Sequence, residues 1–410
     1  MPPPSAPARS GTRAAAAVSI AHGFVDAYVG FLPPLLPRLM VRLGLSIAPA
    51  ATLAMSFSLA SSLMQPVAGW LADRYGRRAF VVGGPVVCAV FLSLIGFAPT
   101  YGALLGLLIL GGLGSAAFHP PAASLAARVG QGAGSGVRMS VFSFGGAVGY
   151  ALGPLVVVAL VAQRGLPGIW IAMVPALLLA PVLFALLPAG HDAAPHRTAP
   201  TSGELRSALA GPLGLVFAIS AIGAFVQRVY LTLAPIVIAE GGGSEAAGAV
   251  ALSTFLGAQA LGTVFGGIMT DRADRRLLLV WMTLAAVPAQ LAAFWLSPAT
   301  PWGLVAAAVA GFFNMAILPP VVVMAQEMLP SRAALGSGIV MGLAWAVGSI
   351  GVMLTGVLAD VVGARSAALM SVPVLLIAPA LAMHPSLRRH ARGRAHADAL
   401  VALDPAVGAD

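Results

Sequence analysis

The sequence predicts an all-α integral membrane protein with twelve transmembrane helices arranged in two six-helix bundles. Three observations lead to this fold class: 59% of the 410 residues are hydrophobic, only 9% are charged, and the apolar residues form long blocks. About a quarter of the residues are charged in an average soluble protein. The blocks have the roughly 20 residues that a spanning helix needs, and they lack the apolar–polar alternation of barrel strands.

The predicted spans and domains follow from the positions of these blocks. We expect spans at 14–36, 48–72, 79–98, 102–127, 136–162, 168–188, 211–239, 246–270, 277–296, 301–326, 333–359 and 365–384. They form an N-terminal bundle over 14–188 and a C-terminal bundle over 211–384, joined by a cytoplasmic linker over 189–210. Cytoplasmic tails cover 1–13 and 385–410. The first apolar run is too long for the core of a signal peptide.

The arginines predict the orientation in the membrane. All 22 basic residues are arginines, and the net charge is +9. With the N-terminus in the cytoplasm, 17 arginines fall in inside segments and 4 in outside loops, while Arg228 lies within a span. This asymmetry predicts that both termini lie in the cytoplasm. We expect the protein to be located in the inner membrane of the cell. Because the arginines cluster between spans, the positive charge indicates topology and not nucleic-acid binding.

The two halves of the chain repeat each other. Segment 69–78 is echoed by 267–276 at an offset of 198 residues, the proline pair at 120–121 by 319–320 at 199, and the Gly-Ser-Gly at 134–136 by 336–338 at 202. Three matches at nearly one offset indicate that a six-span unit has been duplicated. Because six is even, both copies have the same orientation, which is a parallel repeat.

The loop at 69–78 is the most specific motif. Gly69 permits close helix packing, Asp73 and Arg74 end the second span, and Arg77 follows in the loop. This loop resembles the signature loop of the major facilitator superfamily, and the resemblance extends from about Ala14 to Met383. It implies a secondary transporter that works by alternating access, without an enzymatic activity.

The resemblance also implies a conformational gate. In that family the aspartate contacts the start of a helix in the opposite half, where the helix carries a partial positive charge. Asp73 would face span eleven near Ala334, and Asp271, followed by Arg272, would face span five near Gly136. The alternative is that these loop residues only set topology.

Four titratable side chains inside spans are candidates for the substrate and proton pathway. His22 and Asp26 are spaced i, i+4 in span one, His119 lies in span four and Arg228 in span seven. A charged group inside a span normally faces a cavity or a partner, and imidazole titrates near neutral pH. The alternative for His22 is a position at the membrane interface without a role in transport. The alternative for Arg228 is that it only neutralises the charge of Asp26.

Weaker candidates are neutral polar residues in the spans. Gln227 and Tyr230 flank Arg228, Asn314 lies in span ten, and Gln65 and Gln259 are further amides in the spans.

Span five is rich in small residues. Gly145, Gly146, Gly149, Gly153 and Pro154 recur at spacings that favour close helix packing. The segment is similar to the Gly-Pro motif of the superfamily's drug:proton antiporters. Packing without a role in antiport is the alternative.

Three segments together resemble a narrower group. The segments 21–26, 117–120 and 143–149 are similar to those of the fosmidomycin resistance protein group, whose members resemble proton-driven exporters of a phosphonate antibiotic. The intramembrane Arg228 would suit an anionic compound. The chain departs from the usual drug-exporter pattern because span four has no charge between Leu107 and Ala117, so His119 or Asp26 would have to couple protons.

These observations predict proton-coupled efflux of a small drug-like or anionic compound. Uptake of a small organic anion or sugar is one alternative, and a non-transporting sensor or lipid-handling protein is another. We expect no cofactor and no metal, because no phosphate-binding loop with Lys is present, and no Cys/His cluster has metal-site spacing. The expected partners are the substrate, protons and the lipid bilayer, and the resemblance implies a monomer.

Overall fold

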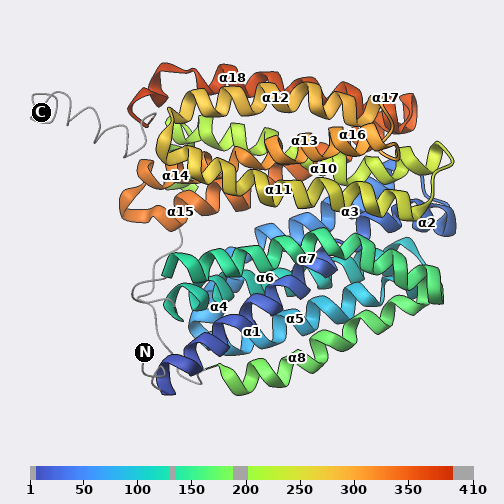
Figure 1. The fold of residues 1–410 in the computed structure, drawn as a ribbon, viewed down its shortest axis with the longest axis horizontal. Helices are drawn as coiled ribbons and strands as arrows, with labels where there is room; N and C mark the ends of the chain where they lie inside the picture. The colour runs from blue at the N-terminus through green and yellow to red at the C-terminus, as the bar shows by residue number, and fades with distance from the viewer. Residues whose placement is uncertain (1–5, 130–134, 188–201, 391–410) are drawn as a thin grey trace, which may run out of the picture. The chain divides into compact units, whose positions relative to one another are not determined.

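The computed structural model describes residues 6–129, 135–187 and 202–390, and the regular structure in these ranges is helical throughout (Figure 1). Twelve helical segments in these ranges are long and apolar enough to cross a membrane. They are Arg13–Leu43, Ile47–Tyr75, Arg77–Phe97, Tyr101–Ala126, Met139–Arg164, Leu166–Leu186, Pro212–Glu240, Glu245–Arg272, Arg275–Trp295, Pro301–Met328, Leu335–Val362 and Ala364–Ala382. The prediction of an all-α chain with twelve spans is confirmed.

Contacts divide the chain into two compact units. Unit 1 contains Met1–Arg197 and Ile238–Ser253, and unit 2 contains Thr198–Val237 and Thr254–Asp410. The predicted N-terminal bundle falls within unit 1, which also takes in a short part of the predicted C-terminal bundle. The bundle boundaries therefore stay a prediction.

Unit 1 contains the first eight α-helices. Their bounds, with two intervening 3-10 helices, are α1 Ala6–Val29, α2 Leu32–Leu43, α3 Ile47–Leu63, α4 Gln65–Tyr75, α5 Arg77–Ser93, η1 Ile95–Phe97, α6 Tyr101–Val129, α7 Ser135–Arg164, η2 Leu166–Ala172 and α8 Met173–Leu186. The most extensive helix contacts in this unit join α1 to α7 and α5 to α6.

The first span is longer than predicted and is broken in its middle. It continues to Leu43, whereas the sequence predicted an end at residue 36. The break separates α1 from α2 at Gly30 and Phe31. Pro33 and Pro34 lack the backbone N–H that would continue the hydrogen bonding of α1, so a new helix begins with these prolines in its first turn.

Glycines allow α1 and α7 to pack backbone to backbone. A Cβ atom added at Gly145 would lie 2.5 Å from the carbonyl oxygen of Ser19. Cβ atoms at Gly149 and Gly153 would overlap the carbonyl oxygens of Gly23 and Ala27. Any larger residue at these positions would push the two helices apart.

Unit 2 contains most of the remaining helices, although α10 and α11 each extend into the segment that belongs to unit 1. The bounds are α9 Ser202–Leu209, α10 Pro212–Glu240, α11 Glu245–Arg272, α12 Arg275–Trp295, α13 Pro301–Ala316, α14 Leu318–Met328, η3 Pro330–Arg332, α15 Ala333–Ser337, η4 Gly338–Leu343, α16 Ala344–Val362, α17 Ala364–Ser371, η5 Val372–Leu376, α18 Ile377–Ala382 and η6 Pro385–His390. The segment η4 is a π-helix, a form that often marks functional sites.

The sequence repeat reappears as a repeated contact. In unit 1, Arg78 donates a hydrogen bond to the carbonyl of Phe184 near the end of α8. In unit 2, Arg276 donates to the carbonyls of Ala382 (3.0 Å) and Met383 (2.7 Å) at the end of α18. Arg276 and Ala382 follow Arg78 and Phe184 at the same offset of 198 residues. A guanidinium at a helix C-terminus satisfies free carbonyls and offsets their partial negative charge.

We predict that Arg276→Met destabilises the protein by about 2 kcal/mol, because two hydrogen bonds from a charged group are lost. A lower melting temperature of the purified protein in detergent would show this. Arg389→Met is the matched control, since it removes an exposed arginine from η6, which follows α18. Equal melting temperatures for the two variants would contradict the capping role.

Candidate functional site

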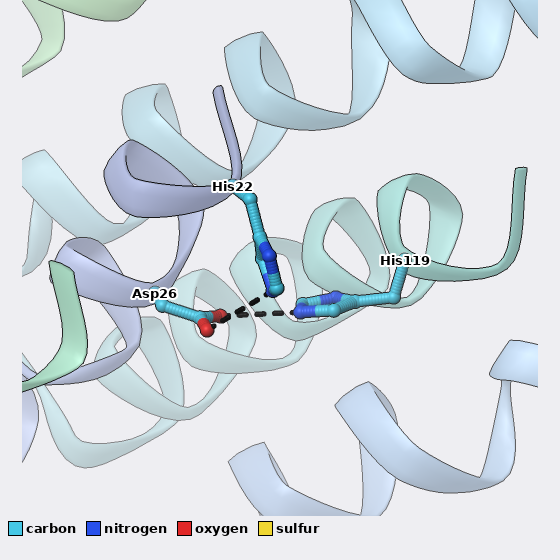
Figure 2. Close-up of side chains that lie close together, drawn as sticks. All are labelled: His22, Asp26 and His119. Carbon is cyan, nitrogen blue, oxygen red and sulfur yellow. Dashed lines mark hydrogen bonds and ion pairs between the residues drawn. The ribbon is translucent and has the colours of Figure 1, made fainter. Parts of the chain in front are cut away.

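A carboxylate in unit 1 lies between two imidazoles. His22 Nε2 is 3.2 Å from Oδ2 of Asp26, and His119 Nε2 is 3.1 Å from Oδ1 (Figure 2). Helix α1 supplies His22 and Asp26 one turn apart, and α6 supplies His119. The structure therefore unites three of the residues that the sequence predicted as pathway candidates.

Backbone carbonyls determine which nitrogen of each ring carries hydrogen. His22 Nδ1 lies 2.8 Å from the carbonyl oxygen of Phe142, and His119 Nδ1 lies 2.8 Å from that of Ser115. A carbonyl oxygen only accepts hydrogen bonds, so we infer that both rings are protonated at Nδ1. Each ring consequently presents Nε2 to the carboxylate of Asp26.

This geometry calls for a proton or a metal ion in each contact between an imidazole and the carboxylate. An unprotonated Nε2 and a carboxylate oxygen are both acceptors, so they approach closely only when a proton or a metal ion lies between them. An ionised carboxylate within a membrane span is also costly unless a cation compensates it. The cluster of His22, Asp26 and His119 is therefore a site at which protons or a metal ion can bind.

Gly146 provides the space for this cluster. A Cβ atom added at Gly146 would lie 2.5 Å from His22 Nε2 and 2.7 Å from Asp26 Oδ2. The ring of Phe142, one turn earlier on α7, stacks on His22 with centroids 4.2 Å apart. Helix α7 thus shapes the cluster through a missing side chain, a carbonyl and an aromatic ring.

The repeat supplies an internal comparison for the cluster. Ser220 Oγ donates to the carbonyl of Val340 at 2.6 Å, and these two residues follow His22 and Phe142 by 198 residues each. The helix-to-helix hydrogen bond therefore exists in both units. Asp26, however, corresponds to Ala224, and His119 corresponds to Leu318 by the offset of the proline pairs. The fold is built in unit 2 without the charged cluster.

Unit 2 instead contains a buried chain of amides. Gln227 donates to Gln259 at 2.9 Å, Gln259 donates to Asn314 at 3.1 Å, and Asn314 donates to the carbonyl of Gly223 at 3.0 Å. Gln227 and Asn314 were predicted as pathway residues, and the structure connects them through Gln259. The three amides satisfy each other inside the unit, which fixes the directions of their remaining polar atoms.

The other two candidates on α10 have different surroundings. The guanidinium of Arg228 lies 5.8 Å from the ring centroid of Trp345, and Arg228 is half-buried. Tyr230 is fully buried against Phe255, with ring centroids 4.2 Å apart, and against Phe294 at 5.4 Å. Tyr230 is therefore a core residue of unit 2, whereas Arg228 is only partly buried.

The predicted gate residues lie in α4, at the start of α5 and at the end of α11. In unit 1, Arg77 Nε donates to Asp73 at 2.8 Å, and Arg74 lies beside the rings of Trp70 and Tyr75. A Cβ atom at Gly69 would meet the ring of Pro120 at 3.4 Å. In unit 2, Asp271 and Arg272 are exposed. The predicted contacts of Asp73 and Asp271 with the opposite half stay predictions.

Sequence reasoning missed two features of these sites. Arg275, the counterpart of Arg77, is buried and donates to Glu327 at 2.6 Å. Arg275 could have been found from the sequence, because the repeat aligns it with Arg77. The expectation of no metal relied on spacing along the chain and stays a prediction; in the fold, three side chains of types that can ligate a metal lie together, with His119 93 residues after Asp26.

Comparison with known proteins decides the family. The model of the Major Facilitator Superfamily matches residues 18–240 and 213–403. This chain belongs to the major facilitator superfamily. It is thus a multi-pass membrane transporter, as the sequence predicted.

Two relatives cover most of the chain. The Fosmidomycin resistance protein of Escherichia coli (strain K12) is 30% identical over 355 residues, which cover 84% of this chain and 86% of the relative. The resemblance to that group is confirmed. The Uncharacterized MFS-type transporter YfnC of Bacillus subtilis (strain 168) is 27% identical over 368 residues, with the same shares covered.

Solved structures share the fold. A bacterial homolog of the human lysosomal transporter Spinster, inward-facing and occupied, has a TM-score of 0.73 at 20% identity and covers 92% of this chain and 97% of its own. The nucleoside transporter NupG has a TM-score of 0.72 at 14% identity, covering 91% of this chain and 98% of its own.

We predict that Gly146→Ala disrupts the cluster. The added methyl group collides with His22 and Asp26, and overpacking of this kind costs about 1–3 kcal/mol. The melting temperature in detergent should fall for Gly146→Ala and should not fall for Gly106→Ala, whose added methyl group meets open space in α6.

A second variant separates the cluster from general helix packing. In a His22→Ala background the ring is absent, so Gly146→Ala should cost markedly less than in the native chain. An equal cost in both backgrounds would show that Gly146 makes room for something other than the cluster.

Proposed function

We propose that this chain exports a small drug-like or anionic compound in exchange for protons. It acts as a monomer in the inner membrane, with both termini cytoplasmic, and works by alternating access of a site near mid-membrane. The observation that carries the proposal is Asp26 held between His22 and His119 inside the spans of unit 1.

The cluster suits a driving-ion site. A transporter driven by a cation gradient needs a group that binds the cation within the membrane and releases it again. Asp26 meets this need because its carboxylate contacts two imidazoles, side chains that can each take up or release a proton. The corresponding positions in unit 2 are Ala224 and Leu318. The charges are therefore dispensable for the shared fold, which supports a role in function.

The proposed cargo follows from unit 2 and from the relative. Arg228 is a half-buried arginine within a span, and guanidinium groups bind carboxylates and phosphonates through paired hydrogen bonds. The relative in Escherichia coli is named for resistance to fosmidomycin. The buried amides of Gln227, Gln259 and Asn314 support α10 beside Arg228.

The proposed gate uses the two homologous loops. Asp73 and Asp271 would each contact a helix N-terminus in the opposite half, and these contacts would break when the transporter opens inward. Arg77 beside Asp73 holds that carboxylate at the end of α4. The 17 to 4 distribution of arginines supports the assignment of these loops to the cytoplasmic face.

We predict that Asp26→Asn strongly reduces coupled transport. Purified protein in proteoliposomes should move fosmidomycin against its gradient when a proton gradient is imposed. The variant should lose this activity by at least about tenfold, as expected when a charged hydrogen-bonding group worth about 1.5–3 kcal/mol is removed. Exchange of labelled for unlabelled compound without a gradient should survive, since Arg228 remains.

Asp360→Asn is the matched control, because it neutralises an exposed carboxylate at the end of α16. Full gradient-driven transport by Asp26→Asn would refute the coupling role of the cluster. Net movement of fosmidomycin in the same direction as protons would identify uptake instead of efflux.

A further inference from the structure

The cluster of His22, Asp26 and His119 has the composition of a metal site. One donor atom from each of the three side chains lies within 4.8 Å of the other two. Two imidazole nitrogens with one carboxylate oxygen are donors that borderline divalent ions such as Zn²⁺, Co²⁺ and Ni²⁺ prefer. The hard ions Mg²⁺ and Ca²⁺ prefer sites built from oxygen alone.

The distances also fit a transition-metal ion. Donor atoms that share a tetrahedral ion with bonds of about 2.0 Å are about 3.3 Å apart. His22 Nε2 lies 3.2 Å from Asp26 Oδ2, and His119 Nε2 lies 3.1 Å from the other carboxylate oxygen, Oδ1. Each imidazole is therefore already at about the required distance from the carboxylate, and the three donor atoms, which lie within 4.8 Å of one another, would move closer together around a bound ion.

Groups behind the ligands already hold the imidazoles in the required tautomer. Histidines that bind metals through one nitrogen usually donate the other N–H to a carbonyl or carboxylate. His22 donates Nδ1–H to Phe142, and His119 donates Nδ1–H to Ser115. Both Nε2 lone pairs are therefore directed at the space beside Asp26.

The charge balance of the cluster is also compatible with a divalent metal ion. The two contacts between Nε2 and carboxylate oxygen each need a cation. Two protons satisfy both contacts, and so does a single divalent ion, and the net charge of the cluster is +1 in either case. A divalent ion can consequently replace two protons without adding charge to the membrane interior.

The site is open to exchange. The side chain of Asp26 is 20% exposed and that of His119 is 24% exposed. Three protein ligands leave at least one coordination position for water, which is typical of exchangeable sites, whereas structural zinc sites use four protein ligands.

We propose that His22, Asp26 and His119 bind one exchangeable divalent transition-metal ion in unit 1. The ion is a borderline cation such as Zn²⁺ or Co²⁺, coordinated by the two Nε2 atoms and the carboxylate. The site does not depend on the proposed efflux function, since it is defined by ligand geometry within one unit.

Titration with Co²⁺ tests the site directly. The full chain is purified with a tag that lacks histidine, because a polyhistidine tag would itself bind the ion. We expect one Co²⁺ per chain, with visible absorption of a nitrogen- and oxygen-coordinated ion and no thiolate charge-transfer band. His22→Gln, His119→Gln and Asp26→Asn should each weaken binding by at least about tenfold, equivalent to about 1.4 kcal/mol.

Controls keep the result interpretable. His384→Gln removes an exposed histidine, and Cys88→Ser removes the single thiol, and both should bind Co²⁺ with native affinity. Zn²⁺ should raise the melting temperature of the native chain and leave that of folded Asp26→Asn unchanged.

Two results would overturn the proposal. One is native protein that binds no Co²⁺, and the other is native affinity in the three ligand variants. The assay uses neither gradient nor fosmidomycin, so a failure here is distinct from a failure of the export assay.

Discussion

A carboxylate inside a membrane span has to be compensated by cations, and much of unit 1 is arranged around this constraint. Asp26 is contacted by two imidazoles, and each imidazole is fixed by a backbone carbonyl from α6 or α7. The close approach of α7 depends on glycines that leave no room for side chains, and Gly146 is the one that faces the cluster. The geometry of the cluster in unit 1 therefore depends on the close packing of its helices.

The duplication shows which parts of the arrangement belong to the fold and which do not. Arginine caps on α8 and α18, and the hydrogen bonds His22–Phe142 and Ser220–Val340, recur at one offset of 198 residues. These contacts hold spans together in both units. The negative charge of Asp26 has no counterpart in unit 2, where Ala224 takes its place and amides and Arg228 provide the polar groups. The two units share a scaffold but differ in the chemistry of their interior.

The sequence predicted the fold class because apolar blocks, arginine placement and the repeat are all local patterns. It predicted His22, Asp26 and His119 one by one, since charged groups in spans are rare. It did not predict their convergence, because that depends on the packing of α1, α6 and α7, which residue spacing does not encode. The burial of Tyr230 was missed for the same reason: its partners Phe255 and Phe294 lie on other helices. The break at Gly30 was readable from Pro33 and Pro34.

The central claim is that both imidazoles carry hydrogen on Nδ1 and present Nε2 to Asp26. ¹⁵N NMR of histidine-labelled protein in lipid measures this most directly. Resonances of His22 and His119 are assigned by their loss in His22→Gln and His119→Gln. We predict a protonated, hydrogen-bonded Nδ1 in both rings, with Nε2 as the nitrogen whose resonance moves when Zn²⁺ is added. An unprotonated Nδ1 in either ring, or a Zn²⁺ response at Nδ1, would contradict the arrangement around Asp26.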